Sequence, residues 1–243
     1  MASATITYDD FSNAKLETIR SSELSAIVFN CSLKPSPQTS HTDRLLKRME
    51  HIFEFANVDF EIVRAVDYNL APGVKADMRD DGFEDEWPKL AQKVRNANII
   101  ILATPIWLGE ESSVCRQVIE RLYGMSAEQN EQGQYAFYGK VGAAVVTGNE
   151  DGVKHCSMSL LYALNHIGCT IAPQADTGWI GEVGPGKSFG DEGAGLENTF
   201  TKRTTTFAAW NAMHLASMLK MSGMPDYGNN VKRWQNGERF AHP

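Results

Sequence analysis

Short runs of apolar residues recur along the chain, and each is followed by a stretch in which apolar residues return every three or four positions. The runs are rich in β-branched residues, which is typical of strands buried on both faces. They predict five strands, at residues 24–30, 59–67, 98–107, 140–148 and 169–176. The run NIIILATPIW, at 98–107, is the strongest of these signals.

Helical spacing of apolar residues lies between the runs. The first predicted helix is carried by the segment RLLKRMEHIFEFA, and the others lie at residues 87–97, 112–124, 152–168 and 197–220. Either Ser112 or Ser113 can cap the third helix, because a serine hydroxyl accepts hydrogen bonds from the first turn. Gly168 is a natural end for the fourth helix.

Strands and helices alternate from residue 24 to residue 220, which predicts an α/β fold with right-handed crossovers and helices on both faces of a parallel sheet. Five strands fit a flavodoxin-like three-layer sandwich with the strand order 2-1-3-4-5. In such sheets ligands bind beyond the carboxyl ends of the strands, beside strand one. We therefore expect an N-terminal arm (1–22), one flavodoxin-like domain (23–220) and a polar C-terminal tail (221–243).

Composition and charge argue against several classes of partner and location for this domain. The net charge is −7 and no basic stripe is present, so we expect no binding to nucleic acid. The start, MASATITYDDF, lacks the pattern of a signal peptide, and the apolar runs are too short to span a membrane. We expect a cytoplasmic protein with four reduced, widely spaced thiols, at Cys31, Cys115, Cys156 and Cys169.

The segment GEVGPGKS (181–188) fits the phosphate-loop pattern G-x-x-x-x-G-K-[ST] at every fixed position. Its context does not fit, because the fifth strand ends several residues earlier and FGDEGAGLEN follows, which cannot open a helix at Lys187. Pro185 and the glycines indicate an irregular loop. The segment is either a surface loop or a lid over a ligand bound elsewhere.

The stretch after strand one is a better place for a phosphate. It is rich in hydroxyls and leads into a helix N-terminus, where backbone N–H groups favour an anion. Loops and helix caps use serine and threonine for structural reasons too, so this signal alone is weak. The candidate phosphate ligands are Ser32, Lys34, Ser40 and Thr42.

Two further loops follow strands three and four, at the same edge of the predicted sheet. Trp107 can cover a flat ring, although a core tryptophan beside a turn is an equal alternative. Glycines after strand four let backbone N–H groups approach a ligand, although a plain strand-to-helix turn would use them as well. The candidates are Pro105, Ile106, Trp107, Leu108 and Gly109 in one loop, and Thr147, Gly148, Asn149 and Gly152 in the other.

Taken together, Ser32-x-Lys34 with Ser40-x-Thr42, the segment ATPIWLGEESSVCRQVIERL and TGNEDG resemble the NADPH-dependent FMN reductase family of flavodoxin-like flavoproteins, over residues 24–220. The resemblance implies FMN, with its phosphate on the first loop and its isoalloxazine on residues 105–109 and 147–152. It also implies an oxidoreductase that passes hydride from NADH or NADPH to the flavin and then electrons to a quinone, flavin, azo compound or similar small acceptor. Many members of the family are homodimers or homotetramers.

The sequence departs from the family in a few places. The first loop is longer, with Pro35 and Pro37, and Lys34 stands where arginine is common. The cysteine cluster of the iron–sulfur branch is missing, so we expect no cluster. His155 and His166 share one face of a predicted helix without carboxylate or cysteine ligands arranged with them, so we expect no metal site. Hydride transfer needs no acid or base, so no catalytic residue is assigned. We expect the 181–195 loop to set substrate specificity or to cover the flavin.

Three other functions compete with this interpretation. A flavodoxin-type electron carrier would bind FMN but react slowly with NAD(P)H. A phosphoacceptor signalling domain needs aspartates at the strand ends, whereas strand one ends Phe29-Asn30-Cys31. A nucleotide hydrolase would have to work through GEVGPGKS.

Overall fold

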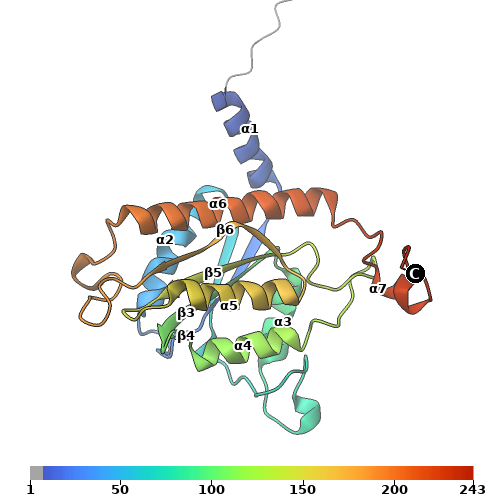
Figure 1. Cartoon of the computed structure of the whole chain (residues 1–243), viewed down its shortest axis with the longest axis horizontal. Helices are drawn as coiled ribbons and strands as arrows, with labels where there is room; N and C mark the ends of the chain where they lie inside the picture. Colours follow the sequence, from blue (N-terminus) through green and yellow to red (C-terminus); the bar gives the residue numbers. More distant parts are fainter. Residues whose placement is uncertain (1–7, 243) are drawn as a thin grey trace, which may run out of the picture.

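The computed structural model describes residues 8–242, which fold into a sheet covered by helices on both faces (Figure 1). The strands are β1 (Ser25–Asn30), β2 (Asp59–Arg64), β3 (Ile99–Trp107), β4 (Glu110–Glu111), β5 (Val141–Thr147) and β6 (Thr170–Trp179). The helices are α1 (Tyr8–Ser21), α2 (His41–Phe55), α3 (Trp87–Asn96), α4 (Ser113–Tyr123), α5 (Val153–His166), α6 (Thr199–Ser222) and α7 (Val231–Gln235).

The sheet has the order β2-β1-β3-β5-β6, and these five strands are all parallel. The predicted flavodoxin-like order is therefore confirmed, because β5 and β6 are the fourth and fifth predicted strands. The additional strand β4 pairs antiparallel with the end of β3. It was not predicted, since two consecutive glutamates carry no strand signal.

Two apolar cores hold the three layers together. Successive side chains of a strand point to opposite faces, so Phe29 of β1 packs with Trp87 toward α3, α4 and α5, while Val28 packs with Phe53 toward α2 and α6. Val28, Phe29 and Phe53 are each 0% exposed. This burial on both faces explains why the strands read as continuous apolar runs.

Two predicted strands end at different residues in the structure. The strand predicted at 59–67 ends at Arg64, and residues 65–67 form a 3-10 turn. The strand predicted at 169–176 continues to Trp179, because Thr177 and Gly178 pair with Val145 and Val146 of β5. Polar residues and glycine hide this continuation from a pattern of apolar residues.

The two ends of the chain carry helices that the polar sequence does not predict. In the predicted arm, residues 8–21 form α1, whose Ile19 is 1% exposed, and residues 1–7 lie outside the described part. In the predicted tail, α7 is held by backbone hydrogen bonds from Val231 and Lys232 to Gly133.

Strand β6 forms one edge of the sheet and is irregular in its middle. Its pairing with β5 shifts register between Gly142 and Ala144, where Gln174 adopts a left-handed φ of 53°. Pro173 stands just before it. The irregularity lies on an edge strand of the sheet that residues 8–242 form.

All four cysteines are buried and unpaired. Burial raises the pKa of the Cys156 and Cys169 thiols to about 12, so both are protonated at neutral pH. Among residues 8–242, no helix is long and apolar enough to cross a membrane.

Candidate functional site

Strands β1, β3 and β5 end side by side, and the loops that follow them enclose a cavity of about 280 Å³. Every residue proposed from the sequence lines this cavity except Leu108, Gly109 and Gly152. Sequence analysis did not assign three further residues of its wall. The lining residues are Ser32, Leu33, Lys34, Ser40, His41, Thr42, Pro105, Ile106, Trp107, Thr147, Gly148, Asn149 and Ser188.

Ser32 presents an unused hydroxyl to this cavity. The residue is 4% exposed, and its Oγ has no hydrogen-bond partner within the described chain. Its backbone N–H donates to Asn30 Oδ1 at 3.1 Å, which fixes the start of the loop. A buried hydroxyl without a partner is costly, so a polar ligand at this place would stabilise the site.

The first turn of α2 adds further donors. Ser40 is the N-cap: its hydroxyl accepts from the Asp43 N–H at 3.0 Å, and the Asp43 carboxylate accepts from the Ser40 N–H at 3.0 Å. The proton of the Ser40 hydroxyl remains available for a ligand. Thr42 of α2 and Thr147 at the end of β5 both line the cavity, and their hydroxyl oxygens lie 2.8 Å apart, within hydrogen-bond distance.

Arg64 keeps the first loop in shape, a role that sequence analysis missed. Its guanidinium donates to the carbonyl oxygens of Lys34, at 2.7 Å, and Gln38, at 2.5 Å, and it also pairs with Asp43. Arg64 is the last residue of β2 and lies opposite Asn30 of β1. Its position at the carboxyl end of a predicted strand is the sequence signal that could have identified it as a residue of the site. The ammonium group of Lys34 has no ion-pair partner among residues 8–242, which leaves its charge to the cavity.

Another part of the cavity lining is mostly apolar. It is made by Pro105, Ile106 and Trp107, and the Trp107 side chain is 43% exposed. Glycine is required next to it, because a Cβ on Gly148 would lie 2.4 Å from Ile106 Cγ2. The β5 loop can therefore pack directly on this wall.

The residues that do not line the cavity lie beside it. Leu108 and Gly109 form the turn between β3 and β4, and Gly152 packs against that turn, where a Cβ would lie 3.1 Å from the Gly109 Cα. The Leu108 N–H donates to Glu150 Oε2 at 2.6 Å. The Asp151 carboxylate accepts from the Gly152 N–H at 2.7 Å. Both acidic residues thus serve the loops themselves.

The GEVGPGKS segment does not form a phosphate loop. No helix opens at Lys187, which pairs instead with Glu192 in the same loop. Ser188 lines the cavity, and the Gly184 N–H donates to the Asn149 carbonyl at 2.8 Å. The loop therefore lies along one side of the cavity.

Side chains of helix α2 bind the part of this loop that follows Ser188. Arg44 donates to Asp191 at 2.6 Å, and His41 Nδ1 lies 3.2 Å from the Phe189 carbonyl oxygen. The hydrogen bond from Arg44 lowers the pKa of Asp191, which therefore stays ionised at neutral pH. Phe189 itself is buried, at 2% exposure.

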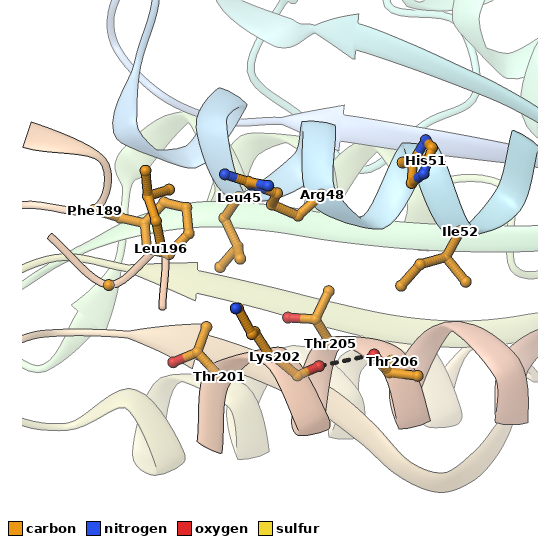
Figure 2. A pocket seen from close by; sticks show the side chains of 11 residues that line it. Leu45, Arg48, His51, Ile52, Phe189, Leu196, Thr201, Lys202, Thr205 and Thr206 are labelled. Atoms are coloured by element: carbon orange, nitrogen blue, oxygen red, sulfur yellow. Dashed lines mark hydrogen bonds between the residues drawn. The ribbon is translucent and has the colours of Figure 1, made fainter. Parts of the chain in front are cut away.

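A second cavity, of about 270 Å³, lies between α2 and α6 (Figure 2). It lies between two helices and not beyond the strand ends, and some of its polar groups already have partners. The Thr205 hydroxyl lies 2.9 Å from that of Thr177, and Lys202 pairs with Glu197. We therefore place the functional site at the sheet edge. The labelled side chains in Figure 2 are Leu45, Arg48, His51, Ile52, Phe189, Leu196, Thr201, Lys202, Thr205 and Thr206.

The residues of the sheet-edge cavity suit an organic anion better than a metal ion. Within residues 8–242 no three histidine, cysteine, aspartate or glutamate side chains gather in a way that could hold a metal. Hydroxyls, a helix N-terminus and the Lys34 side chain line part of the cavity, and the apolar residues 105–107 line another part. A phosphate ester of a planar ring system matches both groups of residues.

Comparisons with known proteins agree with this chemistry. The sequence profile of the NADPH-dependent FMN reductase family matches residues 24–179. The chain is 32% identical over 203 residues to 8-demethyl-8-aminoriboflavin-5'-phosphate synthase of Streptomyces davaonensis, covering 81% of this chain and 79% of that protein. It is also 53% identical over 199 residues to the divalent metal cation transporter MntH of Mycobacterium bovis, but spans only 29% of that protein's length.

Solved structures show the same relationship. The structure of RosB with the bound intermediate 8-demethyl-8-formylriboflavin-5'-phosphate has a TM-score of 0.79 and 29% identity, with 90% of each chain covered. FerB of Paracoccus denitrificans, an NAD(P)H:(acceptor) oxidoreductase, has a TM-score of 0.51 at 15% identity, covering 77% of this chain and 98% of that one, and this likeness concerns the fold alone.

Proposed function

Because this chain belongs to the NADPH-dependent FMN reductase family, we propose that it holds FMN in the sheet-edge cavity and uses NADPH or NADH to reduce a small acceptor. The acceptor is a quinone, a flavin, an azo compound or a similar molecule. The carrying observation is the buried, unpartnered Ser32 hydroxyl beside the N-terminus of α2, where a phosphate would satisfy it.

Each part of the cavity has a role in this proposal. Ser32, Ser40 and the first turn of α2 donate hydrogen bonds to the phosphate, and Lys34 adds a positive charge. Thr42 and Thr147 hold the two sides of the cavity together through their hydroxyls. The wall at 105–107 covers one face of the ring.

The bound flavin would supply the hydride chemistry, so the protein's own task is binding, orientation and exclusion of water. The N-terminus of α5 points its backbone N–H groups toward the same edge of the sheet, where they favour negative charge. The Glu150 and Asp151 carboxylates lie in the loop before this helix and accept hydrogen bonds from the N–H groups of Leu108 and Gly152.

The decisive experiment mixes the purified protein with FMN and then with NADPH or NADH under anaerobic conditions. We expect the protein to retain FMN as a yellow complex and the flavin colour to bleach in a stopped-flow instrument. Retention with only sluggish bleaching would favour a flavodoxin-type electron carrier. A protein that stays colourless in excess FMN would overturn the proposal.

A second function is favoured by the similarity to RosB and to the S. davaonensis synthase, whose names describe riboflavin phosphates altered at position 8. In this function the flavin phosphate is the substrate and not a retained cofactor. Mass spectrometry of the flavin after incubation separates the two: an unchanged mass supports the reductase, and a changed mass supports flavin modification.

We also propose that the protein acts in the cytoplasm as a homodimer or homotetramer. The support for self-association is an exposed apolar pair on α5, where Met158 is 63% exposed and Tyr162, one turn later, is 69% exposed. Apolar side chains grouped in this way are typical of surfaces that contact another chain.

A further inference from the structure

Helices α2 and α6 leave a gap between them. This second cavity has a volume of about 270 Å³ and is nearly as large as the cavity at the sheet edge (Figure 2). Protein interiors are packed closely and contain few voids larger than a water molecule. A cavity of this size between two helices is therefore a reason to look for a ligand.

Short side chains keep this cavity open. Thr201 and Thr205 lie one turn apart on the face of α6 that lines the cavity, and each is only 3% exposed. Gly195 lines it from the preceding loop, where a Cβ would lie 2.6 Å from Phe189 Cδ2. Larger residues at these three positions would fill the space or displace their neighbours.

One part of the cavity lining is apolar. Leu45 and Phe189 are 1% and 2% exposed, and Ile52 and Leu196 are partly buried against the same core. Hydrocarbon surface placed against these side chains is removed from water, which favours binding. A ligand that matches this cavity therefore has an apolar body.

The charged side chains of the lining are all basic. Arg48, His51 and Lys202 line the cavity, and no aspartate or glutamate of the described chain does so. Figure 2 shows that Arg48 comes from α2 and Lys202 from α6. In a chain with a net charge of −7, this grouping of basic side chains favours an anionic ligand.

Existing ion pairs leave one of these basic groups without a partner. Lys202 pairs with Glu197 at 2.5 Å, and His51 lies 3.9 Å from the Glu54 carboxylate. Arg48, in contrast, forms no ion pair with any residue in the range 8–242. A guanidinium group can bind both oxygens of a carboxylate, so Arg48 suits a ligand with a single carboxylate.

The loop that lines one side of this cavity also lines the cavity at the sheet edge. Phe189, Gly195 and Leu196 belong to the second cavity, whereas Ser188, the residue before Phe189, belongs to the first. A ligand gains its contacts with Phe189 and Leu196 only while the loop lies against α2. Binding therefore favours this position of the loop, because a ligand shifts an equilibrium toward the state that it binds better.

We propose that the cavity between α2 and α6 binds a small organic acid with an apolar body and a single carboxylate. Arg48 binds the carboxylate, and the ligand holds residues 189–196 against α2. It thereby also restrains Ser188 at the wall of the sheet-edge cavity. The site is formed by residues that the function proposed above does not use, so it does not depend on that function.

The first test measures the binding of 4-fluorobenzoate to the purified protein by fluorine NMR. Its affinity should be at least about tenfold higher than that of 4-fluorobenzamide, which has the same ring without the charge. Inorganic phosphate should not compete, because it has no apolar body. Absence of saturable binding, equal affinities for the acid and the amide, or displacement by phosphate would each overturn the proposal.

The second test locates the site. Arg48→Gln should weaken the binding of 4-fluorobenzoate about tenfold. The matched control is Arg203→Gln, which removes the same charge from an exposed position on α6 that does not line the cavity, and its affinity should equal that of the wild type. Lys34→Gln should also bind the acid as the wild type does.

Two results of this second test would contradict the site. An affinity that falls in Lys34→Gln and not in Arg48→Gln would place the acid in the sheet-edge cavity. Equal losses in Arg48→Gln and Arg203→Gln would show that only the overall charge of this face matters.

The third test concerns the loop. Addition of 4-fluorobenzoate should slow amide hydrogen exchange at residues 189–196 several-fold in the wild type, and much less in Arg48→Gln at the same concentration. Unchanged exchange in a wild type that binds the acid would overturn the effect on the loop. Failure to retain FMN would overturn the function proposed above and would leave these three results as they are.

Discussion

Ser32 illustrates how a single buried atom can indicate the chemistry of a ligand. Its Oγ lies at the cavity wall without a partner, while the neighbouring Ser40 hydroxyl already accepts the Asp43 N–H. A hydrogen bond to a charged group contributes about 1.5–3 kcal/mol, which corresponds to roughly a tenfold to a hundredfold change in affinity. The loss of this one hydroxyl should therefore be measurable.

We predict that Ser32→Ala weakens FMN binding about tenfold or more, measured by titration of flavin fluorescence. Thr39→Ala is the control, because Thr39 lies exposed in the same loop and does not line the cavity. Equal affinities in Ser32→Ala and wild type would show that the phosphate is bound elsewhere.

At the scale of elements, the 181–195 loop is fixed to the body of the protein by side chains of α2. Arg44 donates to both Asp191 and the Phe189 carbonyl, and Gly190 packs so closely that a Cβ there would lie 2.6 Å from Arg44 Cδ. Lys187, in contrast, pairs only with Glu192 of its own loop. Arg44 thus joins helix α2 to the 181–195 loop, whereas Lys187 makes its ion pair within that loop.

Arg44→Ala should therefore loosen the loop, and Lys187→Ala should not. Since a half-exposed ion pair contributes about 0.2–1 kcal/mol, amide hydrogen exchange at residues 188–194 should become roughly 1.4-fold to fivefold faster in Arg44→Ala. Lys187→Ala should exchange as the wild type does and retain its FMN affinity. A loss of FMN binding in Lys187→Ala would contradict this prediction and would indicate that GEVGPGKS binds the phosphate.

The sequence predicts the elements well where apolar periodicity is strong, and poorly where contacts with the rest of the fold decide the conformation. The strands through Val28 and Ile101 are buried on both faces and were recognised as such. Strand β4 and helix α7 consist of polar residues held by their neighbours, so no local pattern predicts them.

The same distinction applies to the candidate site. Hydroxyls and glycines that follow strand ends were found because parallel strands bring their carboxyl ends to one edge. Arg64 and Ser188 were not assigned, because their roles depend on which segments the fold brings beside the first loop. The left-handed backbone conformation of Leu108, with a φ of 55°, could not be predicted, because leucine rarely adopts it.

At the scale of the whole molecule, the end of the sheet opposite the cavity carries a partly buried cation, Lys140, that affects stability. The Lys140 ammonium donates to the carbonyls of Arg95, at 2.7 Å, and Ala97, at 2.6 Å. Burial lowers its pKa to about 8 from an ordinary value of 10.5. Between these two values the unfolded chain binds more protons than the folded one, so folding becomes more favourable as pH rises.

We predict that the free energy of unfolding of the wild type, relative to Lys140→Met, increases by about 2 kcal/mol between about pH 8 and pH 10. Urea denaturation of both proteins across this range measures the difference and removes contributions common to both, including the titration of the buried cysteines. A difference that stays constant or decreases over this range would contradict the buried state of the lysine.

The irregular strand β6 affects how copies of this protein can meet. Pro173 has no N–H to offer, and the left-handed Gln174 interrupts the row of hydrogen-bonding groups along the free side of the sheet. A strand from another molecule therefore cannot pair along the length of β6, and the edge is protected from fibril-like growth. A homo-oligomer that avoids this edge would use other surfaces, such as the exposed face of α5.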